Sequence, residues 1–264
     1  MLARLLACAT ALAGIAAAQI DVAHADGMAR SKGGMYAPAA SATSTAVFSG
    51  IDVVEDSISS YTGFVSAFNR DLSKDGFLLR GVGVYASYEY GTLDSLSNRI
   101  TVEGSAPMVD MMLGYQFIRP GVRSAIYLGG EYQNHDLSPN DRANPVRDDE
   151  FGFKVAGDIE TTSANAFYFG LLGSYSTAFD TYWARGRIGW NFGRLVIGPE
   201  GGLSGNDGYD ARRVGGFVRF PIALGTRDID VSIAAGHQFL KDDSTSSSGG
   251  GEGAYVSAGF STSF

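Results

Sequence analysis

The chain has 264 residues, of which 45% are hydrophobic, 12% aromatic and 18% charged, and its net charge is -8. This acidic balance argues against nucleic acid as a partner, because a phosphate backbone attracts basic surfaces. Its composition, with 36 glycines, departs from that of a usual soluble domain, which has ~25% charged residues and ~7% glycine. After the N-terminal segment the chain holds no run of about 18 apolar residues, which excludes a helical membrane span.

The N-terminus predicts a secretory signal peptide over residues 1–25. Met1 to Arg4 is a short basic start, residues 5–18 are apolar or small, and the A-x-A cleavage site is formed by Ala23 and Ala25. Cleavage there removes Cys8, the only cysteine, so the mature protein would have neither a disulfide nor a thiol nucleophile. Residues 26–44 are rich in Ala, Ser and Gly without periodicity, and we interpret them as a flexible periplasmic lead-in.

The rest of the chain, residues 45–264, divides into alternating runs of about ten residues separated by turn residues. Apolar residues on one face and polar residues on the other are typical of strands in an outer-membrane barrel, with lipid outside and a polar lumen inside. We therefore predict an all-β fold, a single transmembrane antiparallel β-barrel of about twelve strands. The runs fall near 45–54, 60–70, 77–90, 107–118, 123–135, 150–160, 165–177, 181–192, 194–203, 209–220, 228–239 and 253–264.

The last run shows this alternation clearly. Val256, Ala258 and Phe260 lie on one face, with Phe264 as the final residue, while the other face is mostly Ser, Gly and Tyr. A terminal aromatic residue that closes such a strand resembles the sorting signal of bacterial outer-membrane barrels. An edge strand of a soluble β-sandwich is the alternative interpretation of this segment.

The connections alternate between short and long segments. Short ones are expected at 71–76, 119–121, 161–164, 193–194 and around 225–226, and longer ones at 91–106, 136–149, 204–208 and 241–252. Outer-membrane barrels have short periplasmic turns and longer extracellular loops. This sorting predicts that both termini are periplasmic, although one connection on the long side, near Phe179, is short.

Charged residues recur on the faces that we assign to the lumen. Arg185 and Arg187 alternate with apolar residues, and a charge that faces hydrocarbon costs roughly 2–4 kcal/mol, so both must point inward. The same reasoning gives eight lumen-lining candidates: Arg185, Arg187, Arg213, Arg219, Lys154, Glu131, Glu200 and Asp158. Arg80 and His237 fall on the outward face, which requires that they lie near an interface or that the register differs by one residue.

The inward charges, which also include Arg123, Asp110, Glu150, Glu160 and Asp230, have both signs, and two interpretations remain open. Opposite charges could pair across a narrow interior and close it with salt bridges. Alternatively, arginines on one wall and carboxylates on another could line a narrow polar channel.

Catalytic patterns are weak, and we expect no catalytic, cofactor-binding or metal-binding residues and no enzymatic activity. Residues 81–86 match a loose dinucleotide fingerprint, but a strand follows them where a helix is needed, and we interpret Gly81 and Gly83 as small lumen-facing residues. His135 and Asp136 lie at the start of a long connection, where a solvated turn pair is the usual arrangement.

Several segments resemble the cellulose biosynthesis protein BcsS family. The similar stretches span Phe48–Ser57, Tyr61–Gly63, Leu113–Gln116, Gly130–Tyr132, Gly198–Gly201 and Ala258–Phe264. The resemblance implies an outer-membrane protein of a Gram-negative bacterium that is linked to cellulose, an exopolysaccharide, and it supplies no catalytic residues.

The function predicted from this resemblance is that of a structural or channel-forming accessory to cellulose biosynthesis or export. The expected partners are outer-membrane lipid, the barrel-assembly machinery and, from the resemblance, cellulose synthase or export components or the glucan chain. A porin-like diffusion channel for small solutes and a surface hydrolase or lipid-modifying barrel are the alternatives.

Overall fold

The computed structural model describes residues 43–93, 97–162, 166–224, 227–241 and 251–264. Ala23, Ala25 and nearly all of the predicted lead-in lie outside the described residues. None of the helices in the described part is long and apolar enough to cross a membrane. The elements are β1 (Thr45–Val54), β2 (Ser57–Ala67), β3 (Gly76–Leu93), β4 (Arg99–Arg119), β5 (Val122–Ser138), β6 (Asp148–Thr161), β7 (Phe167–Ser176), the short 3-10 helix η1 (Ala178–Asp180), β8 (Tyr182–Asn191), β9 (Val196–Asn206), β10 (Tyr209–Leu224), β11 (Arg227–Leu240) and β12 (Gly253–Ser263).

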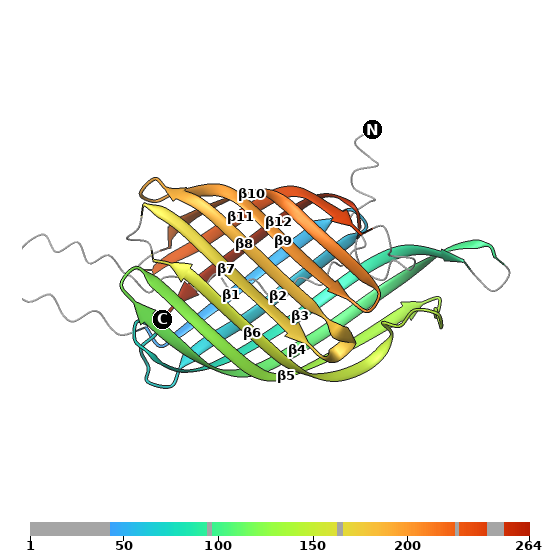
Figure 1. Ribbon diagram of the computed structural model, residues 1–264, viewed down its shortest axis with the longest axis horizontal. Helices are drawn as coiled ribbons and strands as arrows, with labels where there is room; N and C mark the ends of the chain where they lie inside the picture. The colour runs from blue at the N-terminus through green and yellow to red at the C-terminus, as the bar shows by residue number, and fades with distance from the viewer. Residues whose placement is uncertain (1–42, 94–96, 163–165, 225–226, 242–250) are drawn as a thin grey trace, which may run out of the picture.

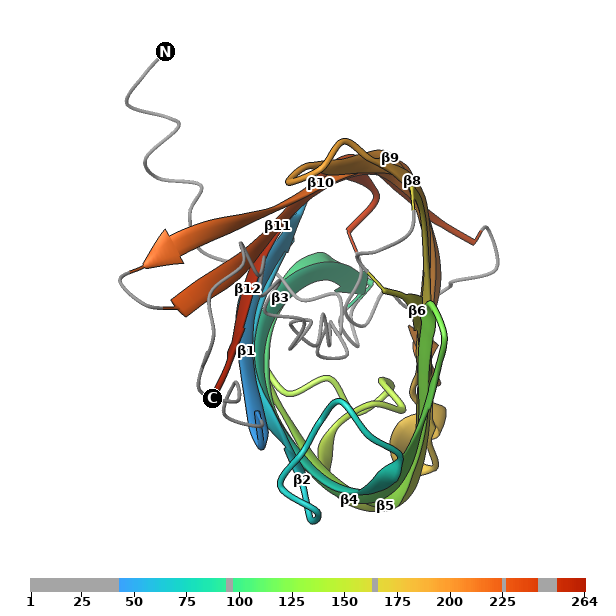
Figure 2. The same cartoon turned by 90° about the vertical axis from the view of Figure 1, so that its left-hand side faces the viewer.

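The strands form one closed antiparallel barrel (Figure 1), which confirms the predicted fold class. Each strand pairs with its neighbours in the sequence, and β1 closes the ring on β12 through a register that runs from Ala46 opposite Ser263 to Val54 opposite Tyr255. Closure leaves no unpaired sheet edge around the ring, which is the condition for a sheet to cross lipid. Seen along its length, the ring has an elongated cross-section (Figure 2).

Alternation along each strand separates an apolar outer face from a buried inner face. In β4 and β5, for example, Leu113 and Leu128 face each other on the outside and are more than half exposed, whereas the adjacent Tyr127 is buried. The same outward set continues around the ring with Phe153, Ile188, Val214, Ile233 and Val256. A continuous apolar exterior of this kind is typical of a transmembrane barrel.

The register of β3 differs from the predicted one. Arg80 is buried inside the barrel, while Phe77 and Tyr85, an odd number of residues away, are exposed. Gly81 is therefore on the outer face, where it lies against the ring of Phe64, and the interpretation of Gly81 and Gly83 as lumen-facing residues is wrong. The face of β3 was ambiguous from sequence, because both of its faces carry apolar residues and only one carries an arginine. His237 does point outward and lies near the end of β11, where its ring stacks on Phe239.

The two ends of the barrel differ. At the terminal end, where β1 starts and β12 finishes, the described connections are 68–75, 120–121 and 192–195. At the opposite end, which we call the loop end, β3 and β4 continue past the ring as a two-stranded extension (Figure 1). Most of the predicted loop at 91–106 is therefore strand, and so is most of the predicted loop at 204–208. The difference in connection length between the two ends is thus less regular than expected.

Candidate functional site: the interior of the barrel

The eight predicted lumen-lining side chains all point into the barrel and are largely shielded from solvent. Six of them belong to buried residues, and the side chains of Arg213 and Asp158 are only 12% and 6% exposed. They sit on inward positions of β5, β6, β8, β9 and β10, as alternation requires. Their hydrogen-bond and ion-pair partners show whether they form a salt-bridged interior or line a channel.

On the wall made by β3 to β6, one lysine joins two carboxylates. The Lys154 ammonium donates to Asp110 at 2.8 Å and also to Glu131. Arg80 approaches the same Asp110 at 3.6 Å. Because these strands are neighbours, the cluster holds its two acids and two bases within one wall and leaves no net charge there.

Nearer the terminal end, ion pairs join both neighbouring strands and strands that are far apart around the ring. Arg123 donates to Asp158 at 2.6 Å between β5 and β6. Arg219 of β10 donates to Glu160 of β6, four strands away around the ring, and its other nitrogen lies 3.4 Å from Asp230. The Arg219–Glu160 bridge therefore runs across the interior.

The opposite wall contains two more cross-links. Arg187 of β8 donates to Glu200 at 2.7 Å and to Ser232 of β11 at 2.9 Å. The Tyr255 hydroxyl of β12 donates to the other oxygen of Glu200 at 2.6 Å. Such charge-assisted bonds between strands that are three places apart tie this side of the ring together.

Arg213 is held by an acid that comes from the start of the barrel. Its guanidinium binds both carboxylate oxygens of Asp52, on β1, at 2.6 and 2.8 Å, and its Nε donates to Gln238 at 2.6 Å. Arg185 lies beside the ring of Trp183, with 5.7 Å from its guanidinium carbon to the ring centroid. The four arginines therefore do not form an open ladder that faces a separate wall of carboxylates.

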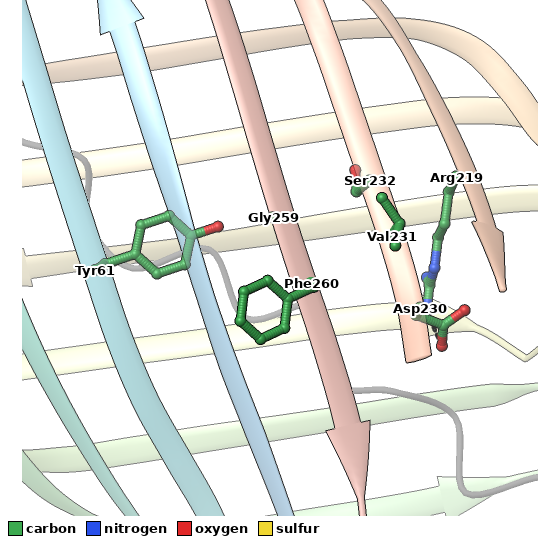
Figure 3. Close-up of a pocket in the computed structure, with 7 residues that line it drawn as sticks. All are labelled: Tyr61, Arg219, Asp230, Val231, Ser232, Gly259 and Phe260. Atoms are coloured by element: carbon green, nitrogen blue, oxygen red, sulfur yellow. Dashed lines mark hydrogen bonds and ion pairs between the residues drawn. The ribbon is translucent and has the colours of Figure 1, made fainter. Parts of the chain in front are cut away.

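Two of the cavities beside these pairs are very small. Figure 3 shows a small cavity between β10, β11 and β12, lined by Tyr61, Arg219 and Asp230 among others. Its volume is about 10 Å³, as is that of a second cavity beside Arg185 and Arg213, and roughly this much space holds one water molecule. Among the described residues, the geometry corresponds to the salt-bridged interior and not to the channel with charge-separated walls.

The terminal end is narrowed by the connection between β2 and β3. Leu72 of this turn is buried against the apolar residues of the interior. Gln116, which is fully buried, donates to the carbonyl oxygens of Leu72 and Lys74 at 3.1 and 2.7 Å. Hydrogen bonds from Lys74 and Ser73 lower the pKa of Asp71 to about 2, which keeps this carboxylate charged and the turn in place.

At the loop end, aromatic and amide side chains pack together inside the barrel. Tyr88, Tyr90 and Tyr209 belong to one buried cluster, and the Tyr88 hydroxyl lies 3.1 Å from Nδ1 of His135. Nε2 of His135 lies 3.2 Å from the Gln133 side-chain oxygen. His135 is therefore buried, and the prediction that it forms a solvated pair with Asp136 is wrong, because adjacent residues of a strand point to opposite faces.

A family model described as "Cellulose biosynthesis protein BcsS" matches residues 46–264, from β1 through β12. The chain belongs to this family. The match confirms the resemblance that the sequence segments indicated. A search of curated proteins found no match for the BcsS-family chain.

Solved structures similar to this BcsS-family chain have low sequence identity to it. One is CdiB from Acinetobacter baumannii, with 6% sequence identity and a TM-score of 0.34 over 84% of this chain and 60% of that chain. Another is the beta domain of the Bordetella autotransporter BrkA, with 13% identity and a TM-score of 0.37 over 84% of this chain and 100% of that chain. A third is OprB from Pseudomonas putida, with 9% identity and a TM-score of 0.29 over 84% of this chain and 92% of that chain. This chain thus spans 60% of the length of CdiB. Its own fold is assigned from its strand pairing.

Sequence reasoning missed two charged members of this interior, Asp52 and Arg80. Asp52 lies in a segment whose other residues gave no charge pattern, and Arg80 was placed on the wrong face. The need for ion pairing could have indicated both residues, because buried Arg213 and buried Asp110 each require a partner of opposite charge.

Proposed function

We propose that this BcsS-family barrel resides in the bacterial outer membrane and serves cellulose biosynthesis as a non-catalytic structural component. The observation that carries the proposal is the family match over the whole barrel. The apolar exterior supports a membrane location, because a continuous ring of exposed Leu, Phe, Val and Ile is stable only against lipid.

The side-chain bridges across the interior favour a structural role over an open channel. An ion pair spans the interior between Arg219 and Glu160, and a second group of bonds joins β8, β9, β11 and β12. A chain of sugar residues that moved along the axis would have to displace these paired side chains. We infer that glucan or protein partners are met at the ends of the barrel and not along its axis.

The proposed orientation places both termini in the periplasm. The described connections at the terminal end have at most eight residues, whereas the β3–β4 extension projects from the loop end. Barrels of this class keep their turns short on the periplasmic side. Phe264, which is half exposed, would then stand where the barrel-assembly machinery meets the last strand.

The lack of catalysis is also part of the proposal. The most suggestive candidate, His135, has Tyr88 and Gln133 at its two ring nitrogens and the Phe179 ring against its edge. A general base needs access to a substrate proton and an acid or base partner that tunes it. These contacts suit a packed structural histidine.

The proposal is tested by deleting the gene in a cellulose-producing host and measuring cellulose outside the cell and synthase activity in isolated membranes. We expect less external cellulose, or cellulose of altered organisation, with synthase activity retained. A plasmid copy of the intact gene should restore deposition. Unchanged external cellulose in the deletion strain would contradict the proposed function.

A further inference from the structure

The loop end contains a packed cluster of buried aromatic side chains with neutral polar side chains beside it, and we call this cluster the chamber. Tyr88 and Tyr90, successive inward residues of β3, stack with ring centroids 6.3 Å apart at 23°. Tyr209, from β10 on another part of the ring, joins them in one buried cluster. Tyrosines from two walls thus meet across the mouth of the barrel.

Three polar groups in this chamber are buried without a hydrogen-bond partner in the described part of the chain. They are the hydroxyls of Ser57 and Ser59 on β2 and the side-chain nitrogen of Asn206 on β9. All three residues are at least nine-tenths buried. Ser57 pairs directly with Tyr88, and Asn206 with Tyr209, so these groups flank the tyrosine cluster.

Unsatisfied buried polar groups indicate a missing partner. Leaving one unpaired costs roughly 1–3 kcal/mol, and native structures rarely keep several together without a ligand or water that pairs with them. Here the unpaired groups are neutral hydroxyl and amide functions on residues that pair with members of the aromatic cluster. A ligand that matches them has many neutral hydroxyl groups and apolar C–H faces that pack on tyrosine rings, and these are properties of a saccharide.

The connection between β5 and β6, residues 139–147, covers this chamber. Asn144 of this loop donates to the Tyr90 hydroxyl at 2.8 Å, and that hydroxyl donates to Asp141 at 3.1 Å. Val146 and Asn144 are buried under the rim. The loop is therefore fixed to the barrel wall by two hydrogen bonds at the Tyr90 hydroxyl and by the burial of Val146. Removal of that hydroxyl would weaken this attachment.

We propose that the chamber lined by Tyr88, Tyr90 and Tyr209 binds a segment of neutral β-linked glucan when the 139–147 loop lifts. The choice of glucan among saccharides rests on the proposed function, since the family match concerns cellulose. The tyrosine rings supply stacking surfaces, and Ser57, Ser59 and Asn206 supply hydrogen bonds to sugar hydroxyls. The charged interior below the chamber carries no part of this recognition.

The inference is tested with the refolded full-length protein in detergent, with cellohexaose as the probe and titration calorimetry as the measurement. Tyr209→Leu keeps an apolar side chain but removes the aromatic face, and we expect it to weaken binding by roughly 5- to 10-fold. Tyr209→Phe keeps the ring and should bind nearly as the wild type does. Tyr90→Phe removes the hydroxyl that holds the loop and should tighten binding about 2- to 5-fold, because less free energy is spent on opening.

Gel mobility, an interior variant and a second oligosaccharide, maltohexaose, serve as the three controls. The faster mobility of unboiled protein on gels shows that each variant is folded, and Tyr255→Phe, in the charged interior, should leave cellohexaose affinity unchanged. No binding to wild type or to Tyr90→Phe, or equal affinity for maltohexaose, would overturn the assignment. Lack of binding together with lost cellulose in the deletion strain would overturn this site alone, whereas binding without any cellulose effect would support the site and overturn the proposed role.

Discussion

At the scale of single residues, the two faces of a strand obey opposite rules. Val218 lies on the outer face of β10 between Ile197 and Ile233, both of which are exposed, while Arg219 beside it is buried against Glu160. An inward charge can find a partner, but an outward charge meets hydrocarbon. The effect of a substitution on barrel stability therefore depends on whether its position faces lipid or the interior.

Val218→Arg should prevent assembly or strongly destabilise the barrel. A charge near the middle of the lipid-facing band costs roughly 2–4 kcal/mol. Val218→Leu, which keeps the position apolar, should assemble normally. Recovery of the protein in the outer-membrane fraction and its mobility without boiling measure the effect. Equal assembly of the two variants would show that this face of β10 does not contact lipid.

Lys154→Met should lower the temperature at which the folded mobility is lost. The substitution leaves Asp110 and Glu131 as neighbouring buried carboxylates, and removal of one partner of a buried pair costs roughly 3–5 kcal/mol. The double variant Lys154→Met, Glu131→Gln should recover most of the loss, since Arg80 still faces Asp110. If the single variant is as stable as the wild type, the Lys154 ion-pair cluster makes no net contribution to the stability of the barrel.

At the scale of elements, the turn between β2 and β3 depends on one carboxylate. The pKa of Asp71 is lowered to about 2 from an ordinary value of 3.8 by hydrogen bonds from Lys74 and Ser73. A lowered pKa means that this stabilisation is complete above pH 4 and is lost as the pH falls through about 2.

We therefore expect the amide signal of Ser73, which bonds Asp71 at 3.0 Å, to titrate with a midpoint near 2 in NMR spectra of the micelle-bound protein. The signal should be flat above pH 4. Asp71→Asn removes the titrating group and should abolish the transition. A midpoint near 3.8 in the wild type would show that these hydrogen bonds are absent in solution.

At the scale of the whole molecule, the closed ring and the bridges across its interior make one prediction about transport. Purified protein in a planar bilayer should show little conductance compared with 16-stranded porins, because paired side chains occupy the interior. The double variant Arg219→Ala, Glu160→Ala removes a cross-lumen bridge without leaving either charge alone and should raise conductance. Large, steady wild-type conductance would contradict the closed interior and favour the porin-like alternative.

Much of the fold and part of the site could be predicted from sequence, because period-two alternation is a local property. Twelve runs of alternating residues predicted twelve strands, and the inward parity of Arg185, Arg187 and Lys154 followed from the cost of charge in lipid. The extension of β3 and β4 was not predicted, since its many charged and small residues are typical of a loop.

Partners across the barrel were decided by tertiary structure alone. Asp52 and Arg213 are 161 residues apart in sequence, and only closure of β1 on β12 brings them together. The pairing register determined the face of Arg80, and His135 is buried because Tyr88 of β3 and Phe179 of η1 lie beside it. Alternation thus determined which residues face inward, but the closed ring determined which of them meet, because shear and register set the neighbours across an interior.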